Sequence, residues 1–105
     1  MNASYPRIEA VHIDLVQHTL HQLADPAIAA HAQRYFKTGP GQYGEGDRFL
    51  GIRVPELRRL VPRFAGADLP VLLELLHSAW HEERLFALLL MTARFAKGND
   101  RDQAA

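Results

Sequence analysis

The stretch WHEERLFALLLMTARFAK, residues 80–97, decides how this chain can fold. It predicts a helix, but every position from Leu85 to Met91 is apolar, so the helix is apolar all the way round rather than along one stripe. Such a helix must be covered on more than one side. The apolar run is far too short to cross a bilayer, so we expect other helices to cover it. We also expect Gly98 to cap this helix and residues 99–105 to begin another one.

The rest of the chain also predicts helices, and no strand pattern appears in it. Apolar residues recur at spacings of three and four, or alanine dominates, in four further segments. These segments are residues 8–23, 27–37, 55–64 and 69–77. Asp25 and Pro26 supply a cap and a first turn, so the first two helices are expected to form a tight hairpin. Asp68 is expected to cap the fourth helix, and Pro62 to kink the third or end it early.

Successive helical hairpins with a last helix buried on several faces indicate an all-α fold. We interpret it as an α-α superhelix of about five helices stacked as repeats, because a solenoid sandwiches its inner helices between neighbours. A closed four- or five-helix bundle is the alternative. With 105 residues the chain fits a single domain over residues 1–105.

The composition excludes several kinds of site. The formal net charge is zero, so the charge of the whole chain gives no hint of a nucleic-acid or membrane partner. Cysteine is absent, which excludes disulfides, thiolate metal sites and a cysteine nucleophile. The N-terminal segment has no basic stretch followed by an apolar one. We therefore expect a cytoplasmic protein without a membrane partner.

Glycines cluster in residues 39–46, between the second and third predicted helices. The segment GPGQYG, residues 39–44, matches the pattern GxGxxG. A dinucleotide site needs a strand before this pattern and a helix directly after it, and here a helix precedes it. The GK[ST] of a P-loop is missing as well. We interpret the loop as a hinge or spacer rather than a phosphate cradle, with glycines that allow positive φ values.

The sequence does not predict a metal site or a catalytic centre. HEER, residues 81–84, begins like the zinc motif HExxH, but Leu85 stands where the second histidine would be. The other histidines form pairs without a third nearby ligand, so we expect no metal and no other cofactor. Glu82 and Glu83 are interpreted as acids near the positive end of the helix dipole. Serine, histidine and acid residues do not stand in a spacing that predicts a nucleophilic triad.

Positive charge is concentrated between residues 48 and 63. Five arginines face only Glu56 in this segment, and they are Arg48, Arg53, Arg58, Arg59 and Arg63. Clustered arginines can neutralise phosphates of a nucleic acid, although a solvated polar helix face is the alternative interpretation. Of the nearby aromatic residues, Tyr35 and Tyr43 could stack on a base or sugar, whereas Phe36 and Phe49 are expected to pack in the protein.

Several segments occur together in one order along residues 27–98. They are Arg34-Tyr35-Phe36-Lys37, the glycine loop, Phe49-Leu50-Gly51-Ile52, Val54-Pro55-Glu56-Leu57-Arg58, His77-Ser78-Ala79-Trp80-His81-Glu82-Glu83-Arg84-Leu85, and Lys97-Gly98. In this order they resemble the N-terminal part of the DNA alkylation repair protein family, the AlkD-like DNA glycosylases. The glycine loop is an extension relative to the best-described members, and Pro62 is unexpected in the third helix.

The resemblance implies a solenoid of HEAT-like repeats whose concave, basic face holds alkylated double-stranded DNA. Members of the family remove cationic alkylated purines such as 3-methyladenine and 7-methylguanine by hydrolysis of the N-glycosidic bond, without metal or cofactor. Their catalytic aspartate and tryptophans come from repeats beyond the fifth helix, so we assign no catalytic residue in this chain. On its own the chain is expected to bind DNA without performing the chemistry.

The resemblance places Tyr35 against the DNA groove and the arginines of the third helix near the backbone. The expected DNA-binding residues are therefore Tyr35, Lys37, Arg53, Arg58 and Arg59. The alternative function is a non-catalytic helical-repeat scaffold that binds protein or nucleic acid. As part of a glycosylase, the chain is expected to expose an apolar face on the fifth helix, where the next repeat would dock and through which the chain could associate with itself.

Overall fold

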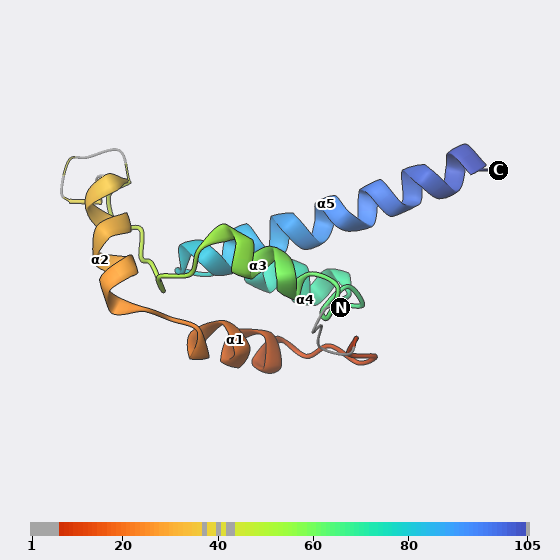
Figure 1. The fold of residues 1–105 in the computed structure, drawn as a ribbon, viewed down its shortest axis with the longest axis horizontal. Coiled ribbons are helices and arrows are strands. Elements are labelled where there is room, and N and C mark those ends of the chain that lie inside the picture. The colour runs from red at the N-terminus through yellow and green to blue at the C-terminus, as the bar shows by residue number, and fades with distance from the viewer. Residues whose placement is uncertain (1–6, 37, 40, 42–43, 105) are drawn as a thin grey trace.

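The computed structural model describes residues 7–36, 38, 39, 41 and 44–104, with the backbone alone described for residues 97–104. This part of the chain forms five helices and no strand, which confirms the all-α fold (Figure 1). The helices are α1 Ile13–Gln22, α2 Pro26–Tyr35, α3 Val54–Leu60, α4 Leu69–Leu76 and α5 His81–Ala104. None of the described helices is long and apolar enough to span a bilayer.

The local signals for helix ends were largely correct. Asp25 accepts hydrogen bonds from the backbone N–H groups of Ala27 and Ile28, as expected of a cap on α2. Asp68 caps α4 by accepting from Val71. Helix α3 ends at Leu60 and turns follow it, so the early end expected from Pro62 is confirmed.

Two helix boundaries differ from the predictions. Helix α1 begins at Ile13 and not at residue 8, because the preceding segment instead reaches the end of the α3 region, where Ile8 N donates to Arg63 O at 2.9 Å. Helix α5 continues through Gly98 to Ala104, so the cap and the separate last helix were wrong. A glycine inside a helix costs only about 1 kcal/mol relative to alanine, which is too little to end a long helix.

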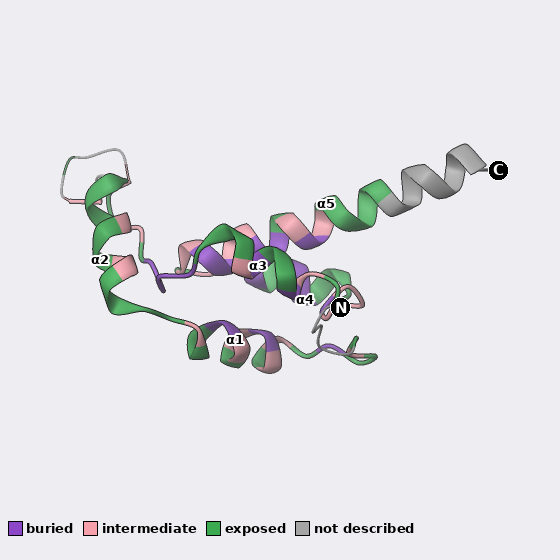
Figure 2. Cartoon of the chain, in the orientation of Figure 1, coloured by how far each residue is buried: buried purple, intermediate pink, exposed green. Residues whose placement is uncertain are grey.

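The core lies between α5 and three other helices. Helix α5 packs against α1, α3 and α4, which confirms that it is covered on more than one side. Phe64 and Phe86 meet edge to face at 5.9 Å in the centre of this core, and both are fully buried. Figure 2 shows the buried residues gathered on the inner faces of α3, α4 and α5 and on one side of α1. Leu88 in the apolar run of α5 is an exception to this burial, because it is 51% exposed.

Helix α2 stands apart from this core. It has no buried residue and does not pack against any other helix of the described part of the chain, so the expected tight hairpin with α1 was wrong (Figures 1 and 2). Its composition explains this, because four of its ten residues are alanine, which offers little surface to bury. Helix α2 is held instead by the connector of residues 47–52, where Asp25 N donates to Leu50 O at 3.0 Å.

The described part of the glycine loop closes on itself. Gly46 N donates to Thr38 O at 3.2 Å, and Gly41 and Gly46 have φ values of 77° and 83°. The N–H group of Gly41 donates to the carboxylate of Glu45 at 2.9 Å. A carboxylate at this position repels a phosphate, so the structure supports the spacer interpretation rather than the cradle.

Candidate nucleic-acid interface

The connector between α2 and α3 is held by a buried carboxylate. Glu82, in the first turn of α5, accepts hydrogen bonds from the backbone N–H groups of Leu50, Gly51 and Ile52 at 2.8, 2.9 and 3.2 Å. Glu82 as a whole is only 3% exposed. These three bonds replace the hydration that a buried carboxylate requires. They fix the connector, and with it the start of α2, to the N-terminus of α5.

Gly51 brings the connector against the start of α2. Its φ is +90°, and a Cβ atom at this position would lie 2.0 Å from Asp25 O and 2.8 Å from Ala29 N. Both neighbours are backbone atoms, so a side chain could be accepted only if the helix moved. The conformation and the contact both require glycine.

Glu83 fastens α1 to α5 in a similar way. Its carboxylate is fully buried and accepts hydrogen bonds from His21 Nε2 at 2.8 Å and Gln17 Nε2 at 3.0 Å. The helix-dipole interpretation of Glu82 and Glu83 therefore missed their main role. A signal was present, because acids in the first turn of a helix that is apolar all round must lie partly inside the protein.

A third group of charges fixes the other end of the connector. Arg84 Nη2 donates to Asp47 Oδ1 at 2.6 Å, and His81 Nδ1 donates to Asp47 Oδ2 at 3.0 Å. Burial raises the pKa of Asp47, but the hydrogen bonds and positive charges of Arg84 and His81 lower it more, so the pKa lies below its usual value. Among the described residues, no three His, Asp or Glu side chains come together as metal ligands.

Aromatic rings join the end of α2 to this group. Phe36 stacks on Phe49 with a centroid distance of 5.2 Å and an interplanar angle of 19°. The His81 ring lies 4.6 Å from Phe49 and 5.4 Å from Phe36. Phe49 is buried, which agrees with the packing role expected for it, whereas Phe36 stacks on Phe49 but is 45% exposed. Tyr35 meets the edge of Phe36 at 5.0 Å.

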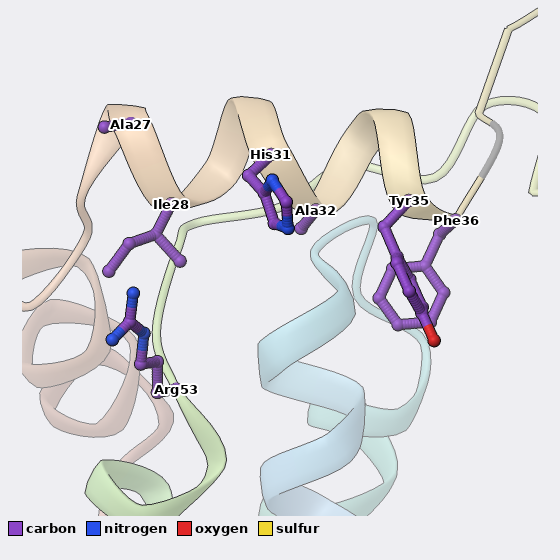
Figure 3. A pocket seen from close by; sticks show the side chains of 7 residues that line it. All are labelled: Ala27, Ile28, His31, Ala32, Tyr35, Phe36 and Arg53. Atoms are coloured by element: carbon purple, nitrogen blue, oxygen red, sulfur yellow. The ribbon is translucent and has the colours of Figure 1, made fainter.

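One flank of α2 forms an open hollow of about 460 Å³ beside the start of α3 (Figure 3). Its lining consists of Ala27, Ile28, His31, Ala32, Tyr35, Phe36 and Arg53. Figure 3 shows the side chains of Ile28, His31 and Tyr35 turned to the side of α2 on which the Arg53 guanidinium lies. Tyr35 is 73% exposed at the rim. The hollow thus combines an apolar wall and an accessible ring with one permanent positive charge.

Two of the expected DNA-binding residues line one hollow, at opposite ends of it (Figure 3). Tyr35 and Arg53 line the same hollow, although they are far apart in the sequence. Arg58 and Arg59 are exposed on α3 but do not line it. Lys37 lies outside the described residues, as does Tyr43.

The wider arginine cluster expected from the sequence is divided. Arg48 lies over the ring of Trp80 at 4.5 Å, and Trp80 lines a second hollow on the opposite flank of α2. Arg63 is half-buried, and its guanidinium lies 5.4 Å from the ring of Phe64. The prediction of one arginine cluster from proximity in the sequence was wrong, because successive arginines of the connector and the short helix α3 lie on different sides of the protein. Trp80 was not expected to shape a hollow.

Comparison with known proteins agrees with the resemblance seen in the sequence. The family of DNA alkylation repair enzymes matches residues 16–104, which takes in all or part of every described helix. No curated protein and no solved structure matches the chain significantly.

Proposed function

Because the chain belongs to the DNA alkylation repair enzyme family, we propose that it binds duplex DNA as the N-terminal repeats of a DNA glycosylase. In this proposal residues 1–105 form one domain of HEAT-like repeats. The glycosylase removes cationic alkylated purines such as 3-methyladenine and 7-methylguanine. Their positive charge makes the base a good leaving group, so hydrolysis needs a stabilised sugar cation and a positioned water. We assign the described residues to holding DNA and not to breaking the bond.

The observation that carries the proposal is the hollow shared by Tyr35 and Arg53. A nucleotide unit has an apolar sugar or base face beside a charged phosphate. The apolar wall and the ring of Tyr35 suit the first part, and the guanidinium of Arg53 suits the second. Such contacts do not read a base sequence, so we expect binding to any duplex.

Arg58 and Arg59 extend the positive charge along α3. Both are exposed, and neither takes part in a described salt bridge. Their long side chains are therefore available to phosphates at a distance from the hollow. An exposed arginine makes its largest contribution by releasing counterions from DNA, which makes affinity fall steeply as salt is added.

The test is the salt dependence of duplex binding, measured by fluorescence anisotropy with a short labelled duplex. Arg53→Ala should flatten the plot of log Kd against log salt by about one, and Arg58→Ala/Arg59→Ala by about two. Arg7→Ala is the matched control for Arg53→Ala, because Arg7 is an exposed arginine next to Ile8, which bonds to Arg63 beyond the C-terminal end of α3, whereas Arg53 precedes the first residue of that helix. Equal slopes for the wild-type protein and these variants would remove the arginines from the interface.

A second candidate function is a scaffold that binds protein. Its docking face would include Leu88 and Phe95 on α5, which are 51% and 74% exposed and lie two helical turns apart on one face. In the glycosylase the same face would receive another helix, and it could also pair two copies of the chain. Sedimentation at rising protein concentration measures the mass of the particle and so tests this pairing. A mass that stays at that of the monomer contradicts it. A chain without affinity for duplex DNA at low salt would favour the scaffold.

A further inference from the structure

We propose that His81 is a positioning residue for DNA binding, because it holds the end of α2 and therefore the ring of Tyr35. The inference rests on the proposed function, in which Tyr35 contacts DNA. Helix α2 has no buried residue and does not pack against another described helix. Its orientation must therefore come from the places where its two ends are attached.

The start of α2 has a backbone attachment. Asp25 bonds to the connector at Leu50, and Gly51 lies in close contact with Asp25 and Ala29. A contact at one end leaves a helix free to swing about that end. The position of Tyr35, in the last turn of α2, therefore depends on the attachment at the other end.

Phe36 supplies that second attachment through two rings, because it stacks on Phe49 at 5.2 Å and lies 5.4 Å from the ring of His81. The His81 ring also lies 4.6 Å from Phe49, so it supports both members of the stack. Phe36 directly follows Tyr35 and meets it edge to face. A shift of the His81 ring would therefore move the pair formed by Tyr35 and Phe36.

Three bonds keep the His81 ring in one orientation. The backbone N–H of His81 donates to Arg48 O at 2.7 Å, which fixes the first residue of α5 to the connector. His81 Nδ1 donates to Asp47 at 3.0 Å, which stops rotation of the ring. Arg84 in turn holds Asp47 at 2.6 Å. The His81 side chain is 31% exposed and does not line the hollow itself.

A double-mutant cycle tests this coupling, using anisotropy with a labelled duplex at one low salt concentration. In the wild-type protein Tyr35→Ala should weaken binding about five-fold or more. In the background of His81→Ala the same change should weaken binding less than two-fold, because the ring is already misplaced. His81→Phe keeps an aromatic ring against Phe36 and should restore most of the Tyr35 effect. His12→Ala, an exposed histidine at the start of α1, should leave that effect at its wild-type size.

The outcomes separate the two proposals. If Tyr35→Ala has no effect in the wild-type protein, the DNA-binding role of Tyr35 is wrong. If Tyr35→Ala weakens binding equally with and without the His81 ring, DNA binding stands and the positioning role is wrong. Should His81→Ala fail to fold by circular dichroism, Phe36→Ala removes the contact with His81 from the side of α2, together with the stack on Phe49. It must abolish the Tyr35 effect as well, and a full effect in that background overturns the inference.

Discussion

Replacing Glu82 by glutamine should destabilise the protein by about 2–3 kcal/mol, although the change keeps the shape of the side chain. Glu82 Oε2 accepts from Gly51 and Ile52, and Oε1 accepts from Leu50. Glutamine has one acceptor oxygen and one NH₂ group. If its oxygen keeps the first pair of bonds, its NH₂ group faces the N–H of Leu50, and two donors then meet in a buried site.

The magnitude follows from the bonds that are lost. A hydrogen bond to a charged group contributes about 1.5–3 kcal/mol, and an unsatisfied buried donor costs about 1–3 kcal/mol. Glu82→Gln loses one of the three bonds outright and weakens the other two by removing the charge. Relief of the desolvated charge offsets part of that loss, which leaves about 2–3 kcal/mol. Small domains have a total stability of about 5–15 kcal/mol, so the change is large.

Urea denaturation followed by circular dichroism measures the effect. The midpoint should fall while the slope of the transition stays constant. Glu74→Gln is the matched control, because Glu74 is exposed on α4 and its replacement should change stability by less than about 0.5 kcal/mol. If Glu82→Gln and Glu74→Gln have the same midpoint, the buried carboxylate does not hold the connector and the account of how α2 is placed is wrong.

Two further predictions concern the same connector. Gly51→Ala places a Cβ atom 2.0 Å from Asp25 O in a backbone with φ of +90°, so it should lower the free energy of unfolding by more than about 1 kcal/mol and displace α2. Gly46→Ala is the control, because its Cβ atom meets no atom within 4 Å and the change should show only the backbone cost. Equal losses of stability in thermal unfolding would contradict this. The pKa of Asp47 is lowered in the folded state, so its contribution is present above the unfolded pKa of about 3.9 and is lost as pH falls through the lower folded value. Wild-type protein and Asp47→Asn should therefore differ in stability at pH 6 and converge toward pH 3, and a constant difference across that range would refute the role of the Asp47 charge.

Local signals predicted much of the fold, and contacts between distant segments account for the errors. The caps at Asp25 and Asp68 and the helix end before Pro62 depend on interactions within one helical turn, so neighbouring residues in the sequence are enough to predict them. The position of α2 depends on residues 49–52 and on His81, which spacing along the chain cannot relate. The extension of α5 past Gly98 depends on the small cost of one glycine in a long helix.

The candidate site was predictable in part for the same reason. Tyr35 and Arg53 were expected from residue type and resemblance, but their shared hollow requires the turn made at Gly51. Arg48 belongs to the arginine cluster seen in the sequence but lies over the ring of Trp80, because a loop does not keep its side chains on one face. The positions of Arg58 and Arg59 on the surface of α3 followed from helical spacing.

The bond between Gly46 N and Thr38 O has a consequence for how this chain can vary. It joins the two ends of the glycine loop, so the rest of the molecule is insensitive to the length of chain between them. Lengthening an already closed loop costs little, because closure entropy grows only with the logarithm of length. Residues 39–45 are therefore a position at which a peptide tag or a reporter domain can be inserted while the path from α2 to α3 is preserved.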